Sequence, residues 1–120
     1  MLTTADLKAR CDAAADATDE QLSEYEAVVA KYSELGLPAM DDGSDLMFSN
    51  HVLCVIKRVH AGECLDEMPE ELFEEISQPA RDASLGLLAG VFSAHGQQPN
   101  KTEVLMLATH LEVAMQAAQQ

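Results

Sequence analysis

The sequence predicts an all-α protein, folded as a compact bundle of about five helices. Apolar residues recur every three or four positions along most of the chain, and several segments open on residues that cap helices. No stretch of useful length alternates between apolar and polar residues with period two, so strands are not expected. With 120 residues, the chain can bury a single core without disulfides or metal.

Residues 1–40 are expected to form an N-terminal helical arm or the first helices of the bundle. Residues 3–16 are rich in alanine and charge, with Thr3 or Thr4 available as the N-cap. Residues 18–21 read as a capping box, in which a threonine and a glutamine satisfy two free N–H groups at a helix start. This spacing predicts a second helix directly after the box.

Residues 41–120 carry the remaining helical signals. Each predicted helix has a capping residue, proline or glycine at one or both ends. The first predicted helix covers residues 44–61, with Ser44 as its cap and Gly62 as its end. A second helix begins at Pro69 and carries Leu72, Phe73 and Ile76. A third covers residues 80–96 after a break or restart at Pro79, and a last helix has Asn100 and Glu103 as its capping box.

The charge of the chain narrows its possible partners. Seven Lys and Arg residues against 21 Asp and Glu residues give a net charge of −14. Phosphates of nucleic acids and anionic lipids repel such a charge, so direct binding to nucleic acid or membrane is not expected. The three cysteines, Cys11, Cys54 and Cys64, are odd in number and irregularly spaced, which favours reduced thiols in a cytoplasmic protein. No secretion signal or membrane-spanning run is recognised.

Two histidines within apolar helical runs are the candidate functional residues. On a helical wheel, His51 lies at the edge of an apolar arc formed by Phe48, Val52, Val55, Ile56 and Val59. Arg58 lies two turns further along, nearly in line with His51. A guanidinium there either stabilises a phosphoryl group on the imidazole or pairs with one of the many nearby carboxylates.

The second histidine, His110, lies in the final helix, which is apolar on nearly every side. Such a helix is typical of the centre of a bundle or of an interface. His110 is therefore expected to be buried, where a ring N–H donates to a neighbouring carbonyl, or to lie close to a partner subunit. Imidazole changes charge near neutral pH and can carry a phosphoryl group, so a pair of such residues is a candidate switch.

These residues resemble the phosphotransferase-system regulation domain, or PRD, of bacterial antiterminators and transcriptional activators. In that family an acidic or amide residue precedes the first histidine, an arginine follows seven residues later, and a second histidine follows a glutamate and an apolar run. The two histidines here lie 59 positions apart (110 minus 51), and the resemblance covers roughly residues 45–116. The matching positions are Asn50, His51, Arg58, Gly62 with Glu63, Glu103 and His110.

The resemblance implies a PRD-like helical domain over residues 41–120 that forms homodimers. It also implies that phosphocarrier or sugar-specific transporter proteins of the phosphotransferase system phosphorylate His51 and His110. Arg58 and Asn50 would then stabilise or orient the phosphoryl group. The implied role is transcriptional regulation through protein association, without a cofactor or a catalytic residue of its own.

Two departures from the family pattern shape this expectation. Residues 78–82 lack the aromatic residues that flank a proline in the family's middle segment. The family's domains usually occur in tandem and attached to an RNA-binding or DNA-binding domain, whereas this chain carries one copy and no basic module. We therefore expect a stand-alone regulatory domain that acts by docking other proteins.

The main alternative on sequence alone is a small helical protein that binds zinc or serves as a structural interaction protein. Two chemical sites remain open within the other classes of function. A zinc site is one, because His51 and Cys54 share a helix face and His60 and Cys64 follow shortly after. An enzyme with His51 as its base is the other, but no recognised nucleophile motif accompanies that histidine. His60 and His95 are interpreted as ordinary helix-end residues, because an imidazolium favours the negative end of a helix dipole. Neither a metal nor an enzymatic activity is the preferred expectation.

Overall fold

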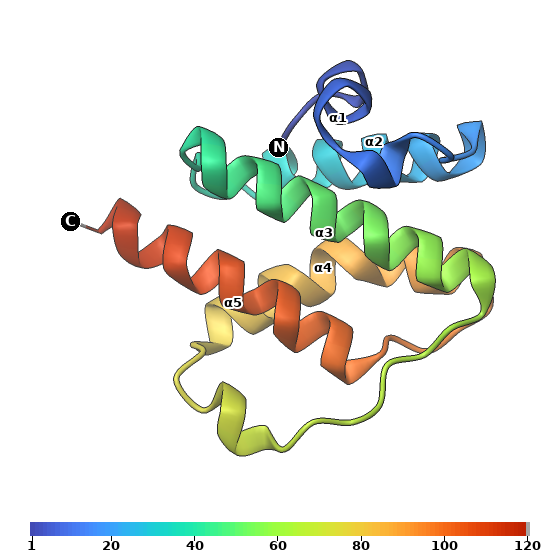
Figure 1. The fold of residues 1–120 in the computed structure, drawn as a ribbon. Coiled ribbons are helices and arrows are strands. Elements are labelled where there is room, and N and C mark those ends of the chain that lie inside the picture. The colour runs from blue at the N-terminus through green and yellow to red at the C-terminus, as the bar shows by residue number, and fades with distance from the viewer. Residues whose placement is uncertain (120) are drawn as a thin grey trace.

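Helix α3 (Asp42–Ala61) lies at the centre of the fold and contacts each of the other four α-helices. A computed structural model describes residues 1–119, which contain five α-helices, two short 3-10 turns and no strand. The predicted all-α bundle is therefore confirmed (Figure 1). The other elements are α1 (Thr4–Arg10), η1 (Asp12–Ala14), α2 (Asp19–Glu34), η2 (Glu70–Phe73), α4 (Gln78–Ala94) and α5 (Lys101–Ala118).

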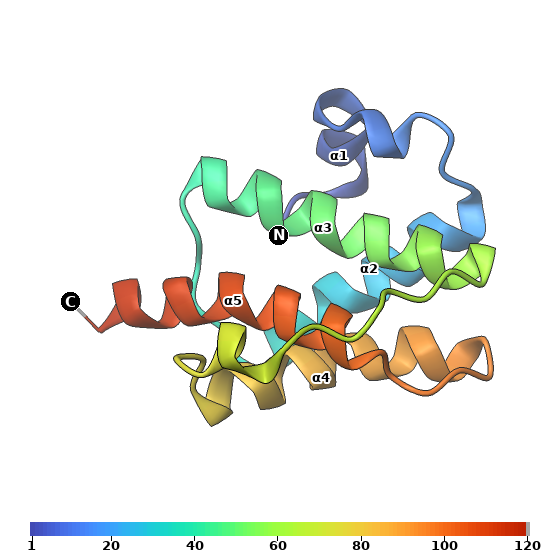
Figure 2. The ribbon, with the colours of Figure 1, turned by 60° about the horizontal axis from the view of Figure 1, so that its bottom comes forward.

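The directions of the helices decide which ends meet. Helices α3 and α4 run in the same general direction, while α2 and α5 run the opposite way (Figures 1 and 2). The C-terminal ends of α3 and α4 thus lie at the same end of the bundle as the N-terminal end of α2. None of the helices in residues 1–119 combines the length and apolar character needed to cross a membrane.

The predicted N-caps of three helices are found in the structure. Thr3 accepts a hydrogen bond from a first-turn N–H of α1. Thr18 and Gln21 form the complete, reciprocal capping box at the start of α2. Asn100 caps α5 by accepting from the N–H of Glu103, but the Glu103 side chain does not return to Asn100, so that box is only half formed. Local sequence thus specifies where these helices begin.

The start of α3 differs from the prediction by two residues, and its end does not. Asp41, not Ser44, is the N-cap, and its carboxylate accepts a hydrogen bond from the backbone N–H of Ser44. An aspartate three residues upstream can reach this N–H from outside the helix, so Ser44 falls within the first turn. The helix ends at Gly62 as predicted, where φ is 73° and a residue without a Cβ is favoured.

The helix predicted over residues 3–16 is shorter than expected. Helix α1 ends at Arg10, and Cys11 adopts an extended conformation with φ −119° and ψ 122°. The chain then re-enters a single 3-10 turn. Leu7, Cys11 and Ala14 are all buried. The break at Cys11 redirects the chain between these core contacts, a tertiary effect that helix propensity does not report.

The helix predicted after Pro69 is also wrong in extent, because only the four-residue turn η2 forms there. Phe73 and Ile76 are buried, but Leu72 is 62% exposed, so the segment has no continuous apolar face to hold a longer helix against the bundle. Pro79 lies in the first turn of α4, where it restarts the helical structure because the missing N–H is not needed there.

One core joins residues from both halves of the chain. The apolar arc predicted on α3 is confirmed, because all five of its members are less than 3% exposed. Leu7 of α1 and Tyr25 of α2 are fully buried in the same cluster. Apolar side chains of α4 and α5 complete it, namely Ala80, Leu87, Leu88, Val91, Phe92, Leu105, Leu107, Ala108 and Leu111.

Polar contacts also fix the N-terminus against α2 and α3. The hydroxyl of Tyr25 donates to the carbonyl of Leu2 over 2.6 Å, and the N–H of Leu2 donates to Ser49 Oγ over 2.9 Å. The terminal amine of Met1 lies 3.0 Å from the Asp45 carboxylate. The first residues therefore pack onto the same core as α3.

Candidate functional site

The two candidate histidines pack edge to face across the interface between α3 and α5. The ring centroids of His51 and His110 are 5.4 Å apart, with an angle of 77° between the ring planes. Phe48 packs edge-on against His110 at a centroid distance of 6.1 Å. Both histidines are half-buried. The structure therefore brings together two residues that are 59 positions apart in the sequence (110 minus 51).

Burial lowers the pKa of both rings below the usual value for histidine. For His51, loss of solvent is the largest cause, and the nearby His110 adds to it by disfavouring a second positive charge. Glu103 acts in the opposite direction on the pKa of His51, and Arg58 lowers it further. For His110, burial alone lowers the pKa. The pair is therefore held in the neutral form, which has a free ring nitrogen, to lower pH than an exposed histidine.

A nearly buried ion pair lies next to these rings. Arg58 Nε and Nη2 donate to the two carboxylate oxygens of Glu103, each over 2.8 Å, so the pair has the bidentate geometry of the strongest ion pairs. The side chain of Glu103 is only 2% exposed, and that of Arg58 is 25% exposed. The pair raises the pKa of Arg58. The sequence left two roles open for Arg58, binding a phosphoryl group or pairing with a carboxylate. In this structure Arg58 pairs with a carboxylate.

The fourth predicted site residue, Asn50, lines a different hollow from the one that His110 lines. It is half-buried and shares its hollow with Arg10, Cys11 and Met47. Adjacent residues on a helix point about 100° apart, so Asn50 follows the margin of α3 that faces the N-terminal segment. Its predicted role in orienting a phosphoryl group stays a prediction.

His110 is accessible from the protein surface. It lines a hollow of about 280 Å³ between the start of α3 and the end of α5. Two other lining residues, Met47 and Val113, are 63% and 62% exposed. The ring of His110 therefore borders a hollow that is open to solvent.

The structure also places together two histidines that the sequence interpretation treated as unrelated helix ends. His60 and His95 have ring centroids 4.2 Å apart, and Nε2 of each ring contacts the carboxylate of Glu24. Cys64, which the zinc hypothesis grouped with His60, is exposed. The sequence held one signal that these two histidines share a position, because His60 and His95 each lie just before a helix-ending glycine. Only the shared direction of α3 and α4 brings those ends together.

Comparisons with known proteins identify the fold. The sequence matches no known family model and no curated protein. Its structure is similar to the crystal structure of a PRD-containing transcription regulator from Lactobacillus casei ATCC 334, with a TM-score of 0.69 and 18% sequence identity. The similarity covers 95% of this chain and 93% of that one. The chain therefore has a PRD-like, all-helical fold.

Proposed function

We propose that this chain is a regulatory domain of a bacterial sugar phosphotransferase system, controlled by phosphorylation of His51 and His110. It acts in transcriptional regulation through association with other proteins, including a second copy of itself. The observation that carries the proposal is the approach of the two imidazoles to 5.4 Å across α3 and α5. The PRD-like fold and the order of motif residues around both histidines support the same function.

The chemistry requires only an accessible and neutral imidazole. A phosphorylated donor protein brings the activated phosphoryl group, so the acceptor needs a ring nitrogen with a free lone pair and no catalytic residue. Burial lowers the pKa of both His51 and His110, which keeps this lone pair available at neutral pH. The hollow beside His110 gives a route for the donor to at least one of the two rings.

Arg58 and Glu103 supply a means of turning phosphorylation into a structural change. A phosphoryl group adds roughly −1.5 to −2 charges at neutral pH. On His51 this charge is attracted to Arg58 and repelled by Glu103, which are already held in one bidentate pair. Arg58 has five N–H donors, and those not used by Glu103 can bind phosphoryl oxygens. Phosphorylation would therefore loosen or redirect a pair that links α3 to α5.

Phosphorylation of one histidine should also disfavour phosphorylation of the other. Two charges of roughly −1.5 to −2 at about the ring separation repel by about 2 to 3 kcal/mol even with the permittivity of bulk water. The second event would be disfavoured by about 30-fold or more. The domain then has three accessible states, unmodified and singly phosphorylated at either histidine, which two donors can set separately.

The test is phosphorylation by a reconstituted phosphotransferase system. The protein is incubated with phosphoenolpyruvate, the phosphotransferase and the phosphocarrier protein, and intact-mass and peptide mass spectrometry locate the phosphoryl group. We expect one group per chain, lost in the His51→Gln/His110→Gln double variant and retained in His60→Gln/His95→Gln. Size-exclusion chromatography with light scattering, run before and after phosphorylation, measures the association. Absence of phosphohistidine at both positions would remove the proposed function.

A further inference from the structure

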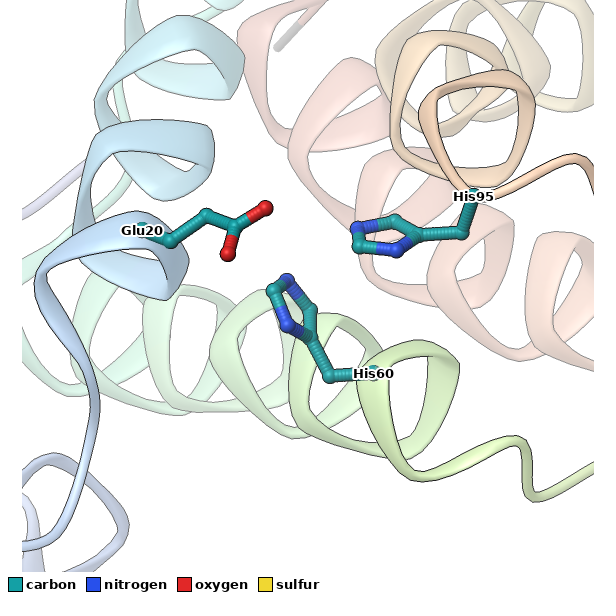
Figure 3. A group of neighbouring side chains, drawn as sticks. All are labelled: Glu20, His60 and His95. Atoms are coloured by element: carbon teal, nitrogen blue, oxygen red, sulfur yellow. The ribbon is translucent and has the colours of Figure 1, made fainter.

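A second histidine pair lies at the C-terminal end of α3, outside the proposed phosphoacceptor site at the middle of that helix. Donor atoms of Glu20, His60 and His95 all lie within 4.8 Å of one another, the only such cluster of three or more histidine, cysteine or acidic residues within residues 1–119. Figure 3 shows the two rings and the Glu20 carboxylate turned toward one another from three different elements. Glu24, one helical turn after Glu20, contacts Nε2 of both rings, over 2.8 Å in the case of His95.

We propose that His60, His95, Glu20 and Glu24 bind one divalent transition-metal ion of the zinc type. Two imidazoles and one or two carboxylates form a donor set that Zn²⁺ accepts in proteins. The two imidazoles exclude Mg²⁺ and Ca²⁺ as preferred ions, because these bind almost entirely to oxygen. Two carboxylates also neutralise the charge of a divalent ion, which favours holding it in a partly buried site.

The geometry lies close to what a tetrahedral ion requires. With metal–nitrogen and metal–oxygen bonds of about 2.0 to 2.1 Å, neighbouring donors of a tetrahedral zinc site are about 3.3 Å apart. The upper limit of 4.8 Å among the donors of Glu20, His60 and His95 calls for an inward movement of up to about 1.5 Å. The Glu24 oxygen that lies 2.8 Å from Nε2 of His95 must instead move outward, by about 0.5 Å, for an ion to lie between the two atoms. Glu20 is exposed and free to change its rotamer, while His60, His95 and Glu24 are only 15 to 21% exposed and already packed together.

Bound metal would fasten three helices at one end of the bundle. Glu20 and Glu24 belong to α2, His60 lies in the last turn of α3, and His95 is the C-cap of α4. These segments are 35 to 75 residues apart in the chain (95 minus 60 and 95 minus 20), so the ion closes long loops of the unfolded chain. His60 lies nine residues beyond His51, about 14 Å along the helix, so this site does not depend on the proposed phosphorylation.

The alternative is that Glu24 serves only as the hydrogen-bond partner of the two imidazoles. That arrangement accounts for the contacts of Glu24 but not for the approach of the Glu20 carboxylate to both rings. The two interpretations differ in one measurable property. A metal site binds zinc with a defined stoichiometry, whereas a purely hydrogen-bonded cluster does not.

The test is isothermal titration calorimetry of the chelator-treated, reduced protein with Zn²⁺, and with Mg²⁺ as the comparison ion. We expect one Zn²⁺ per chain, no comparable Mg²⁺ binding, and a higher Tm in the presence of zinc. His60→Gln and His95→Gln should each weaken zinc binding at least about tenfold, as should Glu24→Gln. His51→Gln/His110→Gln is the matched control, because it removes two imidazoles from the same protein and should leave zinc affinity unchanged.

Two further measurements keep the result unambiguous. Glu20→Gln alters an exposed side chain, so it tests the site even if a histidine variant unfolds, and it should also weaken zinc binding. Substitution by Co²⁺ reports the donors, because cysteine ligands give an intense near-ultraviolet charge-transfer band and imidazole–carboxylate sites do not. Zinc binding that is absent, that survives both histidine substitutions, or that disappears in Cys54→Ser/Cys64→Ser would overturn the proposal.

Discussion

Removing one partner of the Arg58–Glu103 pair should destabilise the protein strongly. Arg58→Met keeps most of the apolar stem but leaves the Glu103 carboxylate, which is 2% exposed, without its cation. Breaking a buried ion pair in this way costs roughly 3 to 5 kcal/mol. Because Arg58 is itself a quarter exposed, we expect a value near the lower end, about 3 kcal/mol. For a chain of this size, that loss lowers Tm by roughly 10 °C.

The measurement is urea unfolding followed by circular dichroism, with Arg10→Met as the matched control. Arg10 makes a bidentate pair of the same kind with Asp42, at 2.9 Å for each hydrogen bond, but the Asp42 side chain is 78% exposed. Water solvates that carboxylate when Arg10 is removed, so the control should lose far less stability. The comparison separates the effect of burial from that of bidentate geometry.

The double variant Arg58→Met/Glu103→Met completes the cycle. Two apolar side chains remove both charges together, so most of the stability lost in Arg58→Met should return. The coupling free energy between the two positions should be at least about 2 kcal/mol. Additive single effects, or an Arg58→Met variant no less stable than the Arg10→Met control, would show that Glu103 is not held by this pair.

Three other predictions follow from the pKa shifts, the core and the helix ends. Burial lowers the pKa of His51 and His110 in the folded state below 6.5, the ordinary pKa of histidine. The stability that these two neutral rings contribute is therefore complete above pH 6.5, and it is lost as the pH falls through their lowered pKa values. Urea unfolding at a series of pH values should show this loss, and it should shrink in His51→Gln/His110→Gln; an unchanged profile would contradict the assignment. Leu7→Ala should cost about 2 to 5 kcal/mol, since Leu7 is fully buried in the common core, whereas a loss below about 1 kcal/mol in the same assay would mean that α1 is a dispensable arm. Gly62→Ala places a Cβ at a φ of 73° and should cost about 1 kcal/mol in thermal unfolding. Gly90→Ala, in an open and exposed position inside α4, is the comparison of opposite sign, because alanine there should stabilise the helix by about 0.5 to 1 kcal/mol.

The helix boundaries show where local sequence was sufficient and where it failed. Capping residues at the starts of α1, α2 and α5 were read directly from the sequence, because an N-cap satisfies N–H groups only two or three residues away. The turn at Cys11 and the short η2 were not foreseen. Both depend on which side chains reach the core, and that depends on residues far along the chain.

The candidate sites follow the same division. Spacing and the resemblance to a known family selected His51, Arg58, Glu103 and His110 as residues of interest, and the wheel placed His51 correctly at the margin of an apolar face. The partner of Arg58 was left undecided between a phosphoryl group and a carboxylate. Many carboxylates in this acidic chain were possible partners, and only the packing of α5 on α3 brought Glu103 within 2.8 Å.

The sequence by itself determined the fold class, most helix starts and the apolar face of α3, because periodicity and capping act over a few residues. The tertiary structure alone decided which histidines meet. His51 packs against His110, and His60 packs against His95 where both rings contact the carboxylate of Glu24. Contacts of this kind depend on the relative directions of whole helices, which are set by burial of the entire core and not by any local pattern.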